Sequence, residues 1–262
     1  MKIVTGLCTI LILFSGLISA QEAQNQITVK EYINLPYVEG DDTLRQLNLL
    51  IPQNIALGPL LIWIGGGAWS YVDRNQEMDL ARRFAENGIA VAAVGHQLSN
   101  PVWQDTTLEV GLQHPVHIKD LARALRWLID RAGKYGYRED QIFDGGFSSG
   151  AHLTALLCTN EKYLKEVGLK IDSIKGIIPI SGTYDLADYH RVFASGPRPE
   201  MAKTHVEAIF GPPQAFAEAS PVTFVHKFNT PMFLISENNL FNYTKLFEDK
   251  IRETDFQNFE VL

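Results

Sequence analysis

Short apolar segments alternate with amphipathic ones along most of the chain. Apolar and polar positions alternate in residues 27–35 and 44–51, which predicts two half-buried strands paired as an antiparallel hairpin. Residues 59–64 and 89–94 are continuously apolar, as is typical of strands buried on both faces of a parallel sheet. The same reasoning predicts further strands in three apolar segments: 174–180, 232–235 and 259–262.

Stretches with helical periodicity lie between these predicted strands. Residues 78–85 place Met78 and Ala81 on one apolar face, and Gly88 provides a stop. Pro115 opens a second helix that ends at Gly136. A third helix is predicted at 240–252. Because helices and strands alternate, the chain is expected to form an α/β fold, with a mostly parallel sheet covered by helices on both faces.

One segment breaks this alternation. Residues 182–219 have no clear period and contain Gly-Pro at 196–197 and Gly-Pro-Pro at 211–213. We interpret them as an irregular cap or lid over the carboxyl ends of the strands.

The composition is that of one globular domain with an export signal. The chain has 262 residues, 46% of them apolar, a formal net charge of −7 and no basic run, which argues against nucleic-acid and anionic-membrane partners. Residues 1–20 resemble a secretory signal peptide, so the domain is expected at 21–262, secreted or periplasmic. The alternative is that this segment stays uncleaved and anchors the protein in a membrane. Only Cys158 remains after cleavage, so no internal disulfide is expected.

The segment Gly146-Phe147-Ser148-Ser149-Gly150 follows an apolar strand and opens a helix-like stretch. In that setting the Gly-x-Ser-x-Gly pattern predicts a nucleophilic Ser148 on a sharp turn, with the backbone N–H of Ser149 at a helix N-terminus. The alternative is an ordinary Gly/Ser loop, because the pattern alone is common by chance.

Three glycines, Gly65 to Gly67, follow the predicted strand at 59–64. Unhindered backbone N–H groups in such a loop can bind an oxyanion, whereas the patterns of dinucleotide and phosphate loops are absent. The nearby Trp69 is predicted either to line the substrate pocket or to pack in the core. Acidic residues downstream, including Glu77, are interpreted as a solvated helix start.

With these motifs placed, the chain resembles the α/β-hydrolase superfamily, in particular its esterase branch of hormone-sensitive-lipase-like, kynurenine-formamidase-like and bacterial feruloyl-esterase-like enzymes. That branch carries His-Gly-Gly-x-Trp, which Gly65-Gly66-Gly67-Ala68-Trp69 matches with Gly65 in place of histidine. It also carries Gly-x-Ser-Ala-Gly-Gly-His-Leu, matched by residues 146–153. The resemblance implies Ser148 as nucleophile and the N–H groups of Ser149, Gly66 and Gly67 as oxyanion donors.

The rest of the family's catalytic triad is less complete. The resemblance places the acid after the seventh strand, where Glu237 or an asparagine, Asn238 or Asn239, stands in the carboxylate's position. The histidine should follow the eighth strand, but the last histidine is His226. His190 and His205, in the cap, are the remaining candidates for a non-standard base. The sequence is therefore expected to be truncated before the triad histidine.

Two hypotheses from different classes remain open. The first is a serine hydrolase that acts on small-molecule carboxylic esters through an acyl-enzyme at Ser148, weak or inactive as given, with no cofactor. The second is a non-catalytic protein that keeps the same fold to bind a ligand or partner. No cluster of His, Cys and Asp has metal-ligand spacing, so no metal is expected.

Overall fold

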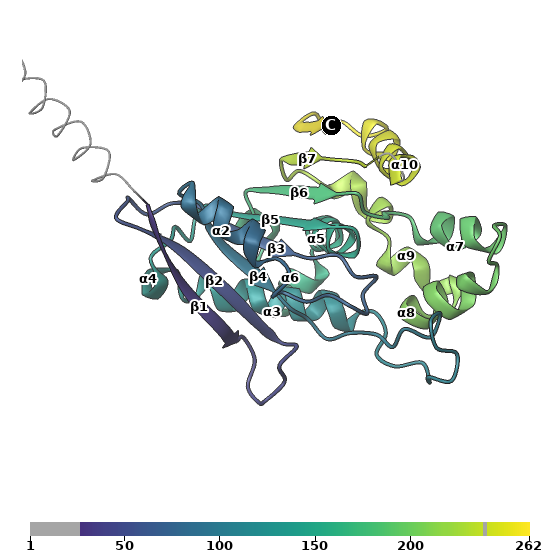
Figure 1. Ribbon diagram of the computed structural model, residues 1–262. Helices are drawn as coiled ribbons and strands as arrows, with labels where there is room; N and C mark the ends of the chain where they lie inside the picture. The colour runs from purple at the N-terminus through teal and green to yellow at the C-terminus, as the bar shows by residue number, and fades with distance from the viewer. Residues whose placement is uncertain (1–26, 238–239) are drawn as a thin grey trace, which may run out of the picture.

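The computed structural model describes residues 27–237 and 240–262, and these form one eight-stranded sheet (Figure 1). The strand order is β1-β2-β4-β3-β5-β6-β7-β8. The strands are β1 Thr28–Pro36, β2 Gln46–Gln53, β3 Leu60–Ile64, β4 Ala90–Val94, β5 Ile142–Phe147, β6 Gly176–Ile180, β7 Met232–Leu234 and β8 Phe259–Val261. Strand β2 pairs antiparallel with β1 and β4, and all other pairs are parallel. The predicted hairpin and mostly parallel sheet are confirmed.

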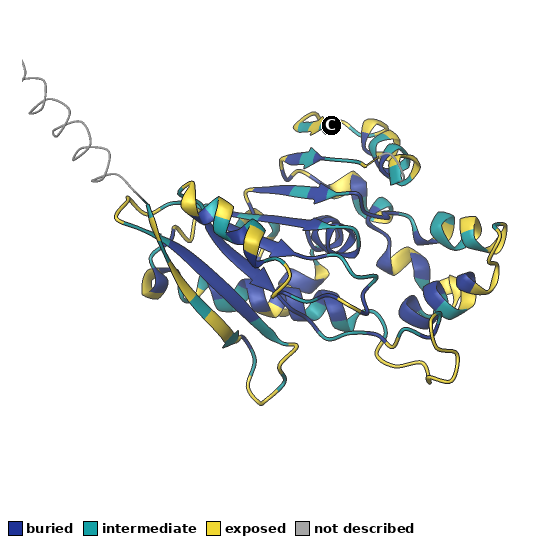
Figure 2. Ribbon diagram, in the orientation of Figure 1, coloured by how far each residue is buried: buried dark blue, intermediate teal, exposed yellow. Residues whose placement is uncertain are grey.

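Helices cover both faces of the sheet, as the alternation predicts. In β3, Leu60, Ile62 and Ile64 belong to the core cluster that includes the apolar faces of α3 (Val116–Ile129) and α5 (Ser149–Thr159). The intervening Leu61 and Trp63 pack in a second cluster with α2 (Met78–Glu86). Successive side chains of a strand point to opposite faces, so one continuously apolar strand supplies both cores. The central strands are accordingly buried (Figure 2).

The predicted helix boundaries agree with the structure to within a few residues. Helix α2 is followed by Gly88, whose φ of 89° is left-handed. The second predicted helix is split into α3 and the short α4 (Ala132–Tyr135), which ends at the left-handed Gly136. The other helices outside the cap are α6 Lys162–Glu166, η1 Ile171–Ser173, η4 Pro221–Lys227 and α10 Phe241–Arg252.

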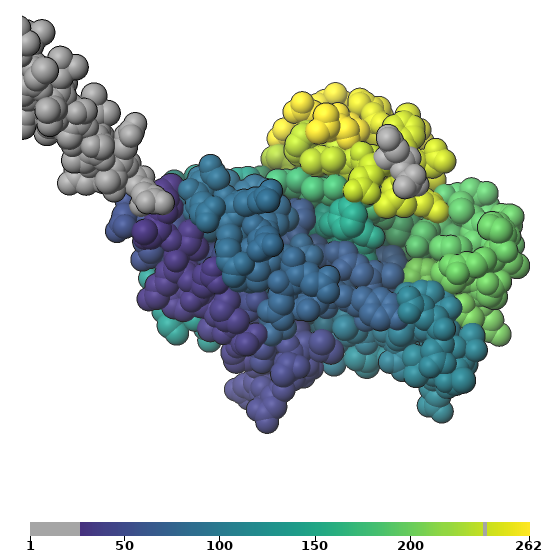
Figure 3. Space-filling view, viewed as in Figure 1, coloured from purple at the N-terminus to yellow at the C-terminus, as the bar shows by residue number. Residues whose placement is uncertain are grey.

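The segment 182–219 is largely helical, so the prediction of an irregular segment is wrong. It contains α7 Leu186–Ala194, the π-helix η2 Ala202–Glu207, α8 Ala208–Phe210, η3 Pro213–Ala215 and α9 Phe216–Ala219. These short helices carry no long apolar stripe because each buries only a few residues, which is why periodicity misses them. We call residues 182–219 the cap segment. It forms a lobe beside the loop that follows β4 (Figures 1 and 3), and the ring centroids of Trp103 and His205 lie 4.3 Å apart across that contact.

The predicted signal peptide, residues 1–20, lies outside the described residues. Within residues 27–237 and 240–262, no helix has the length and apolar character that crossing a membrane requires. Cys158 is a buried free thiol in this part of the chain.

Candidate active site

Ser148 lies in a sharp turn between the end of β5 and the start of α5. Its backbone has φ 53° and ψ −115°, a conformation that costs a residue with a Cβ of order 1–3 kcal/mol. The turn is fixed on both sides, because Ser148 N–H donates to the Ile180 carbonyl at 2.8 Å and the Ser148 carbonyl accepts from His152 N–H at 3.1 Å. The Ser148 residue is half-buried. This strained strand–turn–helix geometry is the one in which a serine hydroxyl is presented to a substrate.

The two glycines of the motif are required by close backbone approach. A Cβ on Gly150 would lie 2.1 Å from the Ile64 carbonyl oxygen, and a Cβ on Gly146 would lie 2.6 Å from the Gly150 carbonyl carbon. Backbone atoms cannot move aside as a flexible side chain can. The glycines therefore let β3, β5 and α5 meet beside Ser148.

The glycine loop after β3, residues 65–69, runs directly past this turn. A Cβ placed on Gly66 would lie 3.3 Å from the Ser148 Cβ, so the two residues are immediate neighbours. Gly67 has φ 146°, and Ala68 and Trp69 have φ 51° and 57°. Consecutive positive φ values are rare outside glycine and mark a loop that its surroundings hold in place.

Ser149 is the first residue of α5 and is 2% exposed. Its N–H belongs to the first turn of the helix, where backbone donors have no partner within the helix and carry a partial positive charge. The arrangement brings a hydroxyl that can attack a carbonyl together with a helix N-terminus and a glycine loop, whose backbone N–H groups can bind the developing oxyanion.

The prediction that Glu77 belongs to a solvated helix start is wrong. The Trp63 Nε1–H donates to Glu77 Oε2 at 2.7 Å, and Glu77 Oε1 occupies the space that a Cβ on Gly65 would fill, 2.4 Å away. The glutamate reaches back from the start of α2 to the glycine loop. The sequence signal for this contact is weak, since only the glycine in place of the family histidine hints at a missing side chain.

The candidate acids lie after β7. Glu237 is exposed, and its backbone N–H donates to the Ser181 hydroxyl oxygen at 2.7 Å. The other candidate, Asn239, and the neighbouring Asn238 lie outside the described residues. Asp185, an acidic residue of the cap segment, has a structural role: its carboxylate caps α7 by accepting the N–H groups of Ala187 and Asp188.

All seven histidines lie in the described residues, and six of them have polar partners other than Ser148. The partners are the Gln97 carbonyl for His96, Tyr163 for His114, Ser99 for His117, Trp69 and Ala219 for His152, Glu207 for His190 and Tyr189 for His205. The seventh, His226, is exposed on η4. The two cap candidates for a base are thus engaged within the cap segment.

Trp69 is 2% exposed and belongs to the main hydrophobic core. Its ring packs edge-on against His152 and Phe210, with centroid distances of 5.2 and 4.8 Å. This placement corresponds to the packing interpretation and not to the wall of a substrate pocket, because a side chain enclosed by other rings offers almost no surface to a ligand.

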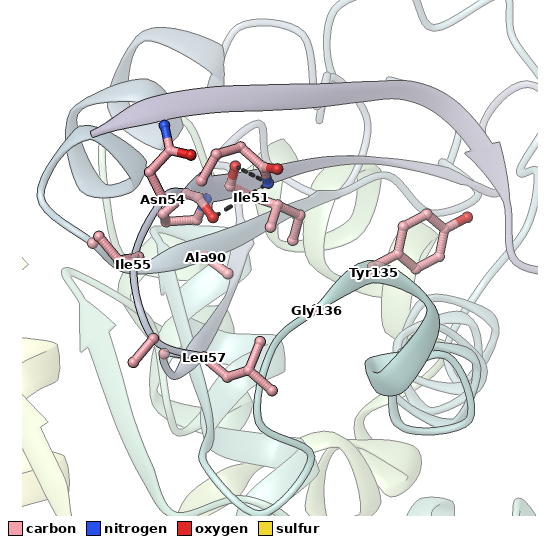
Figure 4. A pocket seen from close by; sticks show the side chains of 12 residues that line it. Ile51, Asn54, Ile55, Leu57, Ala90, Tyr135 and Gly136 are labelled. Atoms are coloured by element: carbon pink, nitrogen blue, oxygen red, sulfur yellow. Dashed lines mark hydrogen bonds between the residues drawn. The ribbon is translucent and has the colours of Figure 1, made fainter. Parts of the chain in front are cut away.

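The pocket in Figure 4 is distant in the fold from Ser148. It has a volume of about 190 Å³ and is lined by the end of β2, the loop that follows it, Ala90, Tyr135 and Gly136. These residues precede β3, β4 and β5, so they lie at the amino ends of the parallel strands, whereas Ser148 follows the carboxyl end of β5. Among the described residues, no group of three or more His, Cys, Asp or Glu side chains is placed to hold a metal ion.

Comparison with characterised proteins gives relatives that carry esterase and formamidase names. Esterase LipQ of Mycobacterium tuberculosis is 29% identical over 188 residues, which are 68% of this chain and 41% of LipQ. Kynurenine formamidase of Salmo salar is 25% identical over 166 residues, which are 63% of this chain and 50% of that protein. The chain thus spans half or less of the length of these relatives.

Solved structures with a similar fold include esterase B from Lactobacillus rhamnosis, with a TM-score of 0.73 at 19% identity, covering 97% of this chain and 82% of that one. A bacterial heroin esterase gives a TM-score of 0.67 at 20% identity, covering 95% of this chain and 80% of that one. At this identity the likeness establishes the fold, which is the α/β-hydrolase fold. The BD-FAE family model matches residues 47–239, about three quarters of the chain, so this protein belongs to the BD-FAE family of α/β-hydrolase proteins.

Proposed function

We propose that the protein is a serine hydrolase that cleaves small-molecule carboxylic esters through an acyl-enzyme at Ser148. The single observation that carries this proposal is the strained Ser148 turn with Gly66 in contact beside it. The esterase names of LipQ and of the structural neighbours support the same reaction class.

The proposed reaction would proceed as follows at these groups. The Ser148 hydroxyl loses its proton to a base as its oxygen attacks the ester carbonyl carbon, and the carbonyl oxygen becomes an oxyanion. The N–H groups of Ser149, Gly66 and Gly67 are the proposed donors to that oxyanion, and each such donor is worth about 2.7–4 kcal/mol in the transition state. As this intermediate collapses, the protonated base returns the proton to the departing alkoxide, so that an alcohol leaves and the acyl-enzyme remains. Water then hydrolyses the acyl-enzyme to the carboxylic acid and free Ser148.

The base limits the rate in this proposal. Among the described residues, no histidine side chain hydrogen-bonds to Ser148, although the backbone N–H of His152 donates to its carbonyl. Glu237, the proposed acid, is exposed and has no hydrogen bond to an imidazole. Loss of the base from a serine triad costs on the order of 10⁶ in turnover. We therefore propose that the chain of 262 residues hydrolyses esters feebly, and that Glu237 or Asn239 takes the acid's place when a base is present.

The second candidate function is binding without catalysis, and the engagement of six histidines elsewhere in the fold favours it. In that case the turn at Ser148 and the glycine loop are kept as parts of a ligand pocket. The two candidates differ in whether Ser148 forms a covalent bond.

Incubation with p-nitrophenyl acetate and with a fluorophosphonate probe, with and without added imidazole, separates them. Imidazole in the buffer supplies the base, so we expect acetylation of the protein by a single acetyl group only when imidazole is present. Intact-protein mass spectrometry detects it. The modification should be lost in Ser148→Ala and kept in Ser195→Ala, a serine at the end of α7.

Acetylation that survives in Ser148→Ala contradicts the proposed nucleophile. If esters stabilise the folded protein without acetylating Ser148, the binding function is supported. Rapid labelling without imidazole shows that a base is already present.

We also propose that the protein acts outside the cytoplasm, secreted or periplasmic. Lys2 and the apolar run that follows it support cleavage after Ala20. N-terminal sequencing of the protein from its native host tests the cleavage: an N-terminus at Gln21 supports it, and an intact N-terminus at Met1 contradicts it.

A further inference from the structure

The glycine loop beside Ser148 is held in an unfavourable backbone conformation. Gly67, Ala68 and Trp69 all have positive φ, and two of them carry a Cβ. Such conformations persist only where the surrounding structure over-determines them. Part of the loop is fixed by its own turn, in which the Gly67 carbonyl accepts from Ser70 and Tyr71 N–H at 2.9 and 2.8 Å. The Trp69 carbonyl also accepts from Ser99 N–H at 3.0 Å, and a further anchor is the side chain of Trp69.

That side chain is bound by a buried histidine of α5, the helix that follows Ser148. Trp69 Nε1–H donates to His152 Nδ1 at 3.2 Å, and both residues are at most 2% exposed. An indole nitrogen is only a donor, so His152 Nδ1 must be the unprotonated acceptor. The proton of the neutral ring therefore lies on Nε2.

His152 Nε2–H in turn donates to the Ala219 carbonyl at 2.8 Å. Ala219 is the last residue of the cap segment, and the next residue closes the base of the cap. The Ser220 hydroxyl accepts from Leu186 N–H at 2.9 Å, at the start of α7, and Val222 N–H donates to the Tyr184 carbonyl at 3.1 Å. The two ends of the cap segment meet where His152 binds it.

Aromatic packing connects the same three parts. Phe210 of α8 lies 4.8 Å from Trp69 and 5.4 Å from His152 between ring centroids, with both pairs edge-to-face. The cap, the glycine loop and α5 therefore share one small buried cluster. A shift of the cap base must change the position of the His152 ring, of Trp69, or of both.

We propose that His152 is a positioning residue that couples the base of the cap segment to the glycine loop, by accepting from Trp69 and donating to Ala219. The coupling deepens the proposed function, because it rests on Gly66 and Gly67 serving as oxyanion donors. A ligand that moves the cap thereby alters the donors, and a correctly seated cap keeps them in place. Burial lowers the His152 pKa to about 3, so the ring keeps the single neutral form that this role requires.

Two measurements test the coupling without requiring turnover, so their failure is distinct from failure of the esterase proposal. The first is the ¹⁵N NMR spectrum of the histidine rings in the unmodified protein. We expect His152 as the Nε2–H form, unchanged from pH 5 to 8. An Nδ1–H form, or titration within that range, overturns the proposal.

The second measurement is hydrogen–deuterium exchange in His152→Phe, which keeps a buried ring and removes both hydrogen bonds. We expect exchange to increase about tenfold or more in two separate segments, the glycine loop at 65–72 and the cap junction at 184–188 with 219–222. The matched control is Thr154→Val on the same helix, because the Thr154 hydroxyl donates to Asp144 at 3.2 Å and bonds to neither the loop nor the cap.

An increase in both distant segments in His152→Phe, and in neither for Thr154→Val, supports the coupling. An increase confined to α5 in both variants overturns it, because His152 would then be an ordinary core residue. If His152→Phe does not fold, Trp69→Phe removes the Trp69–His152 hydrogen bond by deleting its donor. Trp69 makes no hydrogen bond to the cap junction, so the coupling requires that this variant still raise exchange there.

Discussion

Glu77 and Gly65 occupy complementary space beside the glycine loop: the Glu77 Oε1 atom lies 2.4 Å from where a Cβ of residue 65 would be. The other carboxylate oxygen accepts the Trp63 Nε1–H at 2.7 Å. The absence of a side chain at residue 65 is thus matched by a side chain from α2. The loop is thereby supported by a glutamate from the start of α2, in the space that residue 65 leaves empty.

We expect Gly65→Ala to push the Glu77 carboxylate out of place and to break its bond with Trp63. Loss of a hydrogen bond to a charged group costs about 1.5–3 kcal/mol, and urea unfolding measures the decrease in the free energy of unfolding. The loss is limited to this size because the end of the Glu77 side chain is flexible and can move aside, so the backbone need not move.

The control is the same substitution in a Glu77→Ala background, where the space is already empty. There Gly65→Ala should cost less than about 0.5 kcal/mol, since the pair is coupled only through the carboxylate. Equal costs in the two backgrounds would mean that the glycine is needed for some other reason.

Gly150→Ala should be far more damaging, because its Cβ would lie 2.1 Å from the Ile64 carbonyl oxygen, a backbone atom. We expect a loss of more than about 3 kcal/mol or failure to fold, as severe overpacking produces. Gly133→Ala in α4 is the matched control, because no atom lies within 4 Å of its Cβ, and alanine should stabilise that helix by about 0.5–1 kcal/mol. Thermal melts of both variants check this, and similar melting temperatures would contradict the steric argument.

The sequence predicts the sheet and the Ser148 turn well because both depend on local patterns. Continuous apolar runs determine β3 and β4, and glycines two residues either side of Ser148 determine the turn. The Glu77–Gly65 and His152–Ala219 contacts join residues 12 and 67 positions apart, and no periodicity reports such pairs. The prediction for the cap segment fails for a related reason. Its short helices are stabilised by contacts with Trp69 and Trp103, and not by an apolar periodicity in their own sequence.

Asp144 gives a dependence of stability on pH between about pH 4 and pH 8. Burial raises its pKa to about 8, so in the folded protein the carboxyl stays protonated and accepts from Thr154 at 3.2 Å. The unfolded chain releases this proton near pH 4, so between about pH 4 and pH 8 the folded state binds more protons, and its stability falls by up to about 1.4 kcal/mol per pH unit from this group. Asp144→Asn mimics the protonated acid and should remove that contribution.

The measurement is urea unfolding of the wild-type protein and Asp144→Asn at pH 5, 6, 7 and 8. The stability of the variant relative to wild type should rise steadily over this range. A constant difference between the two proteins would show that Asp144 is ionised in the folded state.

Buried histidines give the opposite dependence at acid pH. Burial lowers the pKa of His96, His114 and His205 to about 4 and that of His152 to about 3, and His117 is shifted in the same direction. Their stabilising contribution is complete above the unfolded value near 6.5 and is lost as the pH falls, because the unfolded chain then binds the extra protons. We expect stability to fall below about pH 6 and cooperative unfolding to occur between about pH 5 and pH 4, measured by circular dichroism. Full stability retained at pH 4 would show that these rings accept protons while the protein stays folded.

Ser148 itself should be a site where stability and reactivity oppose each other. Its φ of 53° and ψ of −115° strain any residue that has a Cβ, so Ser148→Ala removes the hydroxyl but keeps the strain. Ser148→Gly removes both, and relief of about 1–3 kcal/mol exceeds the greater unfolded-state entropy of glycine, about 0.4–1 kcal/mol. We therefore expect Ser148→Gly to be more stable than Ser148→Ala by about 1 kcal/mol, measured by urea unfolding, with neither variant acetylated. The same pair at Ser195, which has an ordinary φ of −100° at the end of α7, should show the reverse order. If Ser148→Ala is the more stable of the two, the turn stores no strain and the case for a specially presented hydroxyl loses its physical basis.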